Sequence, residues 1–223
     1  MSSKILVLPG DGIGVEVADQ AIRVIDKLNE LGLDATYEKE LVGGASYDAN
    51  GEPLTSEVLE KAKQSDAILL GAVGGSKWDD VERSKRPEAG LLGLRKELEL
   101  FANLRPALVF EALASASTLK DEVVSNLDIM IVRELTGGVY FGQPRGIEDT
   151  AEGKKAVDTQ VYYDYEIDRI ARVAFDLARK RNNKVTSVEK ANVMETGVLW
   201  RQTVKDTHQD FSDVQLENMF CLL

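Results

Sequence analysis

The chain has 223 residues, 43% of them hydrophobic and 29% charged, which is typical of a soluble globular protein with one large domain or two small ones. The net charge of −11 argues against nucleic-acid binding through phosphate contacts. The single cysteine, Cys221, excludes an internal disulfide and fits a reducing cytoplasm, and an apolar run long enough to span a membrane is absent from the sequence.

The first hundred residues alternate between strand and helix patterns. Strands are expected at residues 4–8, 35–41 and 67–71, and helices at residues 15–31 and 55–64. Asn50-Gly51 marks a turn, and a glycine-rich segment follows the third strand. Repeated strand–helix–strand units predict an α/β domain with a largely parallel sheet.

The turn after the first strand contains three alternating glycines at residues 10–14. It reads G-x-G-x-G, whereas the dinucleotide fingerprint is G-x-G-x-x-G, because Val15 stands in the third glycine's place. The pattern favours a tight strand-to-helix turn. Anion binding at the start of the following helix is the alternative.

Residues 86–106 are expected to form a helix running into a strand. A helical stripe in this segment combines a carboxylate, two leucines and a guanidinium: Glu88, Leu91, Leu92 and Arg95. Arg105 follows in the strand. Two guanidiniums beside an apolar pair suit a dicarboxylate with a branched hydrocarbon tail, because arginine binds carboxylates bidentately. An amphipathic helix with ordinary surface ion pairs remains the alternative.

The second half begins beyond a domain boundary expected near residues 100–106. Polar residues 142–155 are expected to form a loop or a projecting arm. Strands are expected at residues 129–133, 139–141, 157–163, 184–188 and 214–220, and helices at residues 165–181 and 198–208.

His208 is the only histidine, which limits the chemistry available to the chain. A zinc site built on several histidines is excluded. A Ser-His-Asp triad would have to use His208, which lies in a polar stretch typical of a helix end. Acid and base catalysis therefore falls to Lys, Tyr, Asp or Glu side chains.

Five motifs resemble those of 3-isopropylmalate dehydrogenases, in the order of that family. They are LPGDGIG at residues 8–14, GAVGGSKWD at 71–79, RPEAGLLGLRKEL with FANLRP at 86–106, VRELTGGVYFGQPRG at 132–146 and EKANV at 189–193. The resemblance covers the whole chain. It implies an α/β, isopropylmalate/isocitrate dehydrogenase-like fold of two domains that is incomplete at the C-terminus.

The resemblance also implies the role of each domain. Residues 1–100 would be the first half of the cofactor- and substrate-binding domain, and residues 101–223 an incomplete dimerisation domain with a projecting arm near residues 138–163. The implied reaction is oxidative decarboxylation of 3-isopropylmalate with NAD, in leucine biosynthesis. A cytoplasmic homodimer would carry it out, with Mg²⁺ or Mn²⁺ in the complete enzyme.

The site residues follow from the same resemblance. Arg95, Arg105 and Arg133 match the arginines that hold the substrate's carboxylates, and Leu91 and Leu92 match the residues that face its isopropyl group. Tyr140 matches the catalytic tyrosine and Lys190 the catalytic lysine. The segment on the nicotinamide side of the cofactor comprises Gly75, Ser76, Lys77, Trp78 and Glu88. Outside these motifs, Tyr140 would be interpreted as a buried edge-strand tyrosine and Lys190 as a solvated strand-end lysine.

Departures from the family pattern occur at several positions. Val15 and Ser76 stand where the family usually has proline, Glu189 replaces an aspartate, and Thr196-Gly197 replaces two serines. The family's metal-binding aspartates match positions beyond Leu223, so we assign no metal ligand and expect the chain alone to be inactive.

Two alternatives remain open at this point. One is an inactive remnant able at most to dimerise. The other is a related β-decarboxylating dehydrogenase such as homoisocitrate dehydrogenase. The apolar Leu91-Leu92 pair favours isopropylmalate over isocitrate or tartrate, which need polar contacts there.

Overall fold

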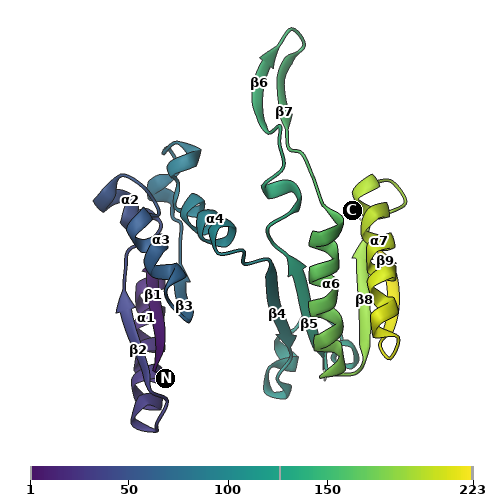
Figure 1. Cartoon of the computed structure of the whole chain (residues 1–223), viewed down its shortest axis with the longest axis horizontal. Helices are drawn as coiled ribbons and strands as arrows, with labels where there is room; N and C mark the ends of the chain where they lie inside the picture. Colours follow the sequence, from purple (N-terminus) through teal and green to yellow (C-terminus); the bar gives the residue numbers. More distant parts are fainter. Residues whose placement is uncertain (1, 126, 222–223) are drawn as a thin grey trace. The chain divides into compact units, whose positions relative to one another are not determined.

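The computed structural model describes residues 2–125 and 127–221. The chain divides into two compact units, a first unit Met1–Glu99 and a second unit Leu100–Leu223 (Figure 1). The division falls beside the boundary expected near residues 100–106. Within the described ranges, none of the helices is long and apolar enough to cross a membrane.

The first unit is a three-stranded parallel sheet with helices packed against it, so the predicted parallel sheet is confirmed. The strand order is β2-β1-β3. Its elements are β1 (Ser3–Gly10), α1 (Ile13–Glu30), β2 (Ala35–Lys39), α2 (Gly44–Asn50), α3 (Ser56–Lys63), β3 (Ala67–Ala72) and α4 (Pro87–Glu97). Two short 3₁₀-helices, Ser76–Trp78 and Arg83–Lys85, lie between β3 and α4.

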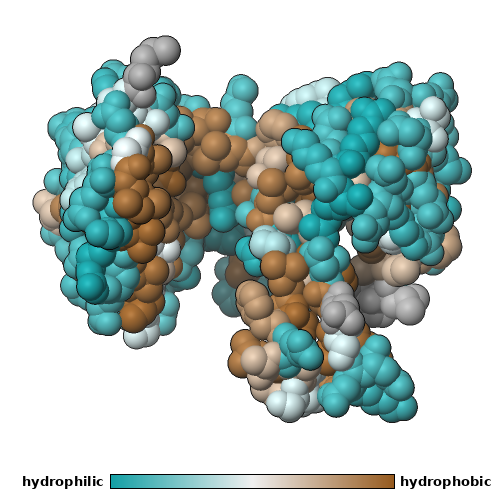
Figure 2. Space-filling model, turned by 90° about the horizontal axis from the view of Figure 1, so that it is seen from below, coloured by the Kyte–Doolittle hydropathy of each residue, from teal (hydrophilic) through white to brown (hydrophobic). Residues whose placement is uncertain are grey.

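The core of the first unit lies on both faces of β1, because side chains alternate along a strand. Leu6 and Leu8 belong to one buried cluster, which includes Val58 of α3 and Leu94 of α4. Val7 packs on the other face against α1. Hydrophobic side chains also remain on the surface of this unit (Figure 2). On α1 they include Val17, Val24 and Leu28, and Leu31 directly follows the helix.

In the described part of the second unit, the strands form three two-stranded sheets. Its elements are β4 (Ala102–Leu108), α5 (Asp121–Val124), β5 (Asp128–Glu134), β6 (Gly146–Thr150), β7 (Gly153–Val157), α6 (Asp164–Arg179), β8 (Lys184–Glu189), α7 (Glu195–His208) and β9 (Gln215–Phe220), with 3₁₀-helices at Glu111–Ala116, Gly138–Tyr140 and Gln209–Phe211. The pairs β4-β5 and β6-β7 are antiparallel, and β8-β9 is parallel.

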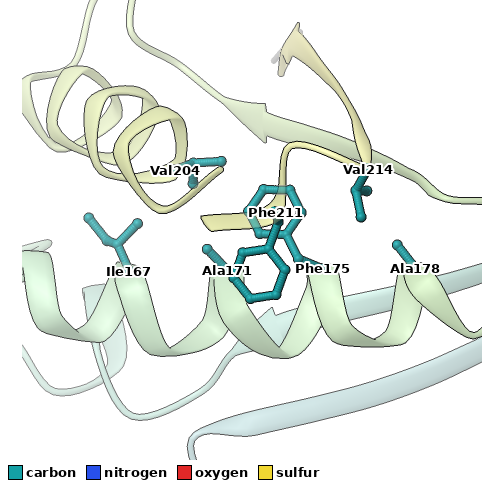
Figure 3. Packing of buried hydrophobic residues seen from close by; sticks show 7 residues of the cluster. All are labelled: Ile167, Ala171, Phe175, Ala178, Val204, Phe211 and Val214. Carbon is teal, nitrogen blue, oxygen red and sulfur yellow. The ribbon is translucent and has the colours of Figure 1, made fainter. Parts of the chain in front are cut away.

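Helix α6 organises the core of the second unit. Its apolar stripe faces α7 and the segment after it (Figure 3). The cluster comprises Ile167, Ala171, Phe175, Ala178, Val204, Phe211 and Val214. Phe175 is fully buried and stacks on Phe211 with ring centroids 5.1 Å apart. The predicted helix at residues 165–181 is confirmed, and its spacing of apolar residues is what places this stripe on one side.

The polar segment after residue 141 forms the β6-β7 hairpin, which projects beyond the rest of the second unit (Figure 1). All five residues of β6 are exposed. Of the two expected forms, a loop or an arm, the segment adopts the arm, with regular strand pairing. Gly153, with φ of +118°, provides the left-handed backbone at the tip of the hairpin.

Two predicted strands are wrong. Residues 139–141 were expected as a strand, but Gly138–Tyr140 is a 3₁₀-helix, because Gly138 has φ of +80° and turns the chain. Residues 157–163 were expected as a strand, but β7 ends at Val157 and the chain then runs without regular structure to α6. The sequence reasoning also missed α2, whose small and polar residues lack a helical apolar stripe.

Candidate active site

Helix α4 carries the mixed stripe on a face distinct from its core face. Its buried residues are Pro87, Gly90 and Leu94. The stripe lies beside them: Glu88 is exposed, and Leu91, Leu92 and Arg95 are half-buried. Pro87 begins the helix, where a missing N–H costs nothing, and Arg95 lies in its last turn. The leucine pair is thus only partly buried and remains able to contact a ligand.

The sheet β4-β5 places two of the predicted arginines on one face. Arg105 is opposite Ile131, and Asn103 is opposite Arg133. Directly opposite residues of an antiparallel pair share a face, so Arg105 and Arg133 are diagonal neighbours on it. Arg105 Nε donates to Asn103 Oδ1 at 2.8 Å. Both guanidiniums belong to exposed residues, which leaves this face able to attract a dicarboxylate.

A pocket of about 360 Å³ in the second unit brings Arg133 and Tyr140 together. The Arg133 guanidinium carbon lies over the Tyr140 ring, 5.4 Å from its centroid. Arg145 donates a hydrogen bond to the Tyr140 carbonyl oxygen. Tyr140 is 49% exposed, so it is not the buried edge-strand tyrosine of the alternative interpretation, and its phenol is open to solvent and to ligands.

The pocket also contains residues that sequence reasoning missed. Gln160, Tyr162, Val188 and Trp200 line it. Tyr162 meets Trp200 edge to face at 5.4 Å. Burial, and then the negative charge of Glu134, raise the pKa of the Tyr162 phenol, which keeps it protonated. The sequence offered no signal for these residues, because they come from three separate segments that only the fold brings together.

Lys190 lies at the end of β8, outside the lining of this pocket as far as the described residues go. Its ammonium donates to the carbonyl oxygen of Cys221. The preceding Glu189 is buried, and its carboxylate accepts from Arg201 Nε at 2.7 Å and from the Ala191 N–H. Within the second unit, Lys190 and Tyr140 are therefore presented at different places.

In the first unit, Asp11 lies in the turn after β1 and joins it to the start of α2 and to the loop after β3. Its buried carboxylate accepts from the backbone N–H groups of Gly44 at 2.9 Å, Ala45 at 2.7 Å and Gly74 at 2.9 Å. Gly14 packs so closely that an added Cβ would lie 2.3 Å from the Pro9 carbonyl oxygen. The G-x-G-x-G segment is thus a tight turn, as the sequence favoured.

The predicted cofactor segment follows β3. Trp78 packs against Gly44 and Gly75, and its Nε1 donates to Asp48 Oδ1 at 3.1 Å. Lys77 pairs with the same carboxylate. Ser76 begins the 3₁₀-helix that contains both residues. Glu88 approaches from α4, because a Cβ at Gly74 would lie 2.7 Å from its Oε1. Gly75 to Trp78 and Glu88 therefore border one glycine loop, with Lys77 and Trp78 directed toward α2.

The remaining predictions concern metal and histidine. Groups of three or more His, Cys, Asp or Glu side chains that could hold a metal were not found among residues 2–125 and 127–221. The ring Nε2 of His208 lies 2.6 Å from the Val214 carbonyl oxygen, at the end of α7. This contact gives His208 a structural role in the second unit.

Comparison with known proteins identifies the class. Residues 4–221 match the family model of isocitrate/isopropylmalate dehydrogenases, and the chain belongs to this family. The fold agrees: the chain superposes on an isocitrate dehydrogenase from Methylococcus capsulatus with a TM-score of 0.77 and 29% identity, covering 98% of this chain and 60% of that one. A protein from Thermus thermophilus, at 22% identity and a TM-score of 0.78, shares the fold over 97% of this chain and 41% of its own.

Among curated relatives, several are named 3-isopropylmalate dehydrogenase. That of Rhodopseudomonas palustris strain BisB18 is 63% identical over 219 residues, covering 96% of this chain and 59% of the relative. That of Chromohalobacter salexigens is 57% identical over 221 residues, covering 99% of this chain and 62% of the relative. The chain thus spans about three fifths of the length of the relatives it matches.

Proposed function

We propose that this chain supplies the substrate-binding and proton-transfer residues of an NAD-dependent 3-isopropylmalate dehydrogenase of leucine biosynthesis. The observation that carries the proposal is the pocket in which Arg133 lies over Tyr140. Relatives of that name, at 57% to 63% identity over nearly the whole chain, support it. The apolar Leu91-Leu92 pair beside Arg95 supports isopropylmalate as the substrate.

The arginines bind and orient the substrate. Arg105 and Arg133, on one sheet face, hold the carboxylates, and Arg95 on α4 adds a third guanidinium. Leu91 and Leu92 contact the isopropyl group, which loses water-exposed apolar area on binding. The leucine pair favours a branched dicarboxylate over a small one such as malate.

Proton transfers belong to Lys190 and Tyr140. We propose that Lys190 acts in the site of the neighbouring subunit of a homodimer, since it lies outside the pocket that contains Tyr140 of its own chain. There it takes the proton of the substrate hydroxyl as the carbon-bound hydrogen leaves as hydride. Carbon dioxide then departs from the β-keto acid, and the Tyr140 phenol protonates the enol carbon to give 2-oxo-4-methylpentanoate. NAD, when bound, accepts the hydride.

Gly74, with φ of +111°, gives the loop after β3 a left-handed turn that favours glycine. We place the nicotinamide side of NAD beside Gly75 to Trp78 and Glu88. For Mg²⁺ or Mn²⁺ the described residues offer no matching group of ligands, so no step is assigned to a metal held by this chain. We further propose a homodimer formed through the second unit and a cytoplasmic location.

A chimera tests the proposal. Residues 1–221 replace the matched part of the Chromohalobacter salexigens relative, and NADH formation is followed with NAD, Mg²⁺ or Mn²⁺ and 3-isopropylmalate. We expect turnover that prefers 3-isopropylmalate to homoisocitrate, isocitrate and malate. A folded chimera without turnover contradicts the proposal, and a preference for homoisocitrate supports the related dehydrogenase instead. The 223-residue protein, assayed alone, tests the expectation that it is inactive by itself.

A further inference from the structure

A buried carboxylate lies between Arg133 and Tyr140 in the sequence. The Glu134 side chain is 1% exposed, at the end of β5. Its Oε2 accepts from the backbone N–H groups of Thr136 at 2.8 Å and Gly137 at 2.7 Å. Its Oε1 accepts from the Thr136 hydroxyl at 3.0 Å. Glu134 thus closes the turn at residues 134–137 with its own side chain.

Arg169 of α6 compensates the buried charge. Its Nη2 donates to Glu134 Oε1 and to Thr136 Oγ1, each at 2.6 Å. Its guanidinium carbon lies 4.6 Å from the centroid of the Phe101 ring. A buried carboxylate without such a partner would be strongly destabilising. The ion pair joins the turn to α6, and the Arg169 guanidinium also contacts Phe101, the residue before β4.

The next residues have little freedom to move. The Gly138 N–H donates to the Val161 carbonyl oxygen at 2.7 Å. A Cβ at Gly137 would lie 3.0 Å from the Tyr162 ring, and one at Gly138 would lie 2.5 Å from the Tyr162 hydroxyl. The 3₁₀-helix Gly138–Tyr140 begins at this constrained glycine, and its last residue, Tyr140, has its ring beneath the Arg133 guanidinium.

We propose that Glu134 is a positioning residue for Tyr140. It holds the turn at residues 136–138, and through that turn it sets the Tyr140 phenol beside Arg133 in the pocket. Its importance for catalysis rests on the proposed role of Tyr140. Replacement by glutamine keeps the shape, but an amide has one acceptor oxygen and an NH₂ group. It cannot accept from the two backbone N–H groups and from Arg169 together.

Fluorine NMR on the 223-residue protein tests the position of Tyr140. The six tyrosines are replaced by 3-fluorotyrosine, and the Tyr140 resonance is assigned with Tyr140→Phe. Glu134→Gln is expected to shift and broaden that resonance while the far-UV circular dichroism is kept. Asp11→Asn is the matched control: Asp11 is also buried and also accepts from backbone N–H groups, those of Gly44, Ala45 and Gly74, all of them in the first unit. It should leave the Tyr140 resonance in place.

Amide hydrogen exchange on the unmodified protein keeps the proposal testable if Glu134→Gln fails to fold. The N–H groups of Thr136 and Gly137 should exchange as slowly as those of β5. Exchange of both at the rate of an unstructured chain overturns the proposal. A Tyr140 resonance unchanged in a folded Glu134→Gln variant also overturns it.

A double-mutant cycle in the chimera separates this inference from the proposed function. Glu134→Gln should lower kcat about 10- to 100-fold, as expected when a catalytic group is misplaced, and should lower it no further in a Tyr140→Phe background. Equal losses in both backgrounds overturn the inference. Near-normal turnover of Tyr140→Phe removes the catalytic role of Tyr140 and so contradicts the proposed function, while the NMR result still decides whether Glu134 sets the ring position.

Discussion

Each proposed proton-transfer residue lies close in sequence to a buried carboxylate that is paired with an arginine. Glu134 pairs with Arg169 ahead of Tyr140, and Glu189 pairs with Arg201 directly before Lys190. Both carboxylates also accept backbone N–H groups of the following residues. Charge-assisted hydrogen bonds of this kind fix backbone geometry more firmly than neutral ones, so they suit the support of a reactive side chain.

The leucine pair of α4 predicts substrate preference. In the chimera, Leu91→Ser with Leu92→Ser should weaken kcat/KM for 3-isopropylmalate more than for malate, because only 3-isopropylmalate has an isopropyl group for the leucines to contact. The expected loss is about 1–3 kcal/mol for each group. Leu31→Ser, at an exposed leucine of the first unit, is the control and should change neither value. Equal losses on both substrates would remove the role assigned to the pair.

Tyr140 and Lys190 predict different kinetic defects. Tyr140→Phe should slow enol protonation more than hydride transfer, and Lys190→Met should slow both. Loss of a general acid or base typically costs about 10²–10⁴-fold in rate. NADH formation reports hydride transfer, and deuterium uptake from D₂O into the product reports protonation. Tyr163→Phe and Lys180→Met serve as controls, and near-normal rates in either test variant would contradict that residue's assignment.

Asp11 predicts a stability effect in the first unit. Asp11→Asn places an amide where three backbone N–H groups converge, so at least one of them loses its acceptor. We expect a loss of about 1–3 kcal/mol in the free energy of unfolding, measured with urea, and faster amide exchange at Gly44, Ala45 and Gly74. The exposed Asp80→Asn change is the control. A loss no larger than the control's would show that water replaces these bonds without cost.

At the scale of secondary-structure elements, α6 is joined to the segment that follows α7 by ion pairs at its surface. Arg172 pairs with Asp168 and Asp210, and Arg179 with Asp213. Arg172 holds the pKa of the Asp168 carboxyl below its usual value, with help from the Thr207 hydroxyl. Arg179 does the same for the pKa of Asp213. These pairs frame the apolar cluster shown in Figure 3.

The lowered pKa values predict sensitivity to acid. A carboxyl whose pKa is lowered on folding stabilises the native state above its unfolded pKa, about 3.9 for Asp, and loses that contribution as pH falls through the native value. The urea concentration at the midpoint of unfolding of the second unit should therefore decrease as the pH is lowered below about 4. The combined Asp168→Asn and Asp213→Asn variant should show a weaker dependence of the urea midpoint on pH. Asp149→Asn in the hairpin should keep the dependence of the unmodified protein. The same pH dependence in the unmodified protein and in both variants would contradict the lowered pKa values of Asp168 and Asp213.

At the scale of the whole molecule, each described hydrophobic cluster draws its residues from one unit. The two clusters around β1 lie within Met1–Glu99, and the α6 cluster lies within Leu100–Leu223. Each unit therefore has a core of its own. The stability of each unit can therefore be measured separately, and a substitution in one core should destabilise only the unit that contains it.

Phe175 predicts an effect confined to the second unit. Phe175→Ala removes a fully buried ring and should cost about 3–5 kcal/mol. Amide exchange at Ile167 and Ala171 should accelerate, while exchange at Leu6 and Val7 of β1 should stay unchanged. Phe110→Ala, at a ring that is 66% exposed, is the matched control. Loss of protection in β1 would show that the two units unfold together.

The regular elements were predictable wherever the apolar pattern was strong. The buried run of β1, the alternation of strand and helix in the first unit and the stripe of α6 each follow from local spacing of side chains. The predictions at residues 139–141 and 157–163 were wrong because short runs of valine, tyrosine and phenylalanine favour a strand, whereas Gly138 and the contact with Val161 impose a turn. Of the candidate site, the motif residues were predictable, but Gln160, Tyr162 and Trp200 were not.

The sequence by itself determined the family, the order of the elements and the residues proposed for chemistry, because those depend on motif identity and on periodicity along the chain. Only the tertiary structure decided which groups support them. Glu134 reaches Arg169, 35 residues away, and Asp11 reaches Gly74, 63 residues away. Such hydrogen bonds join segments that local spacing cannot relate. They form because burying a carboxylate or an N–H group is unfavourable unless the fold supplies a partner.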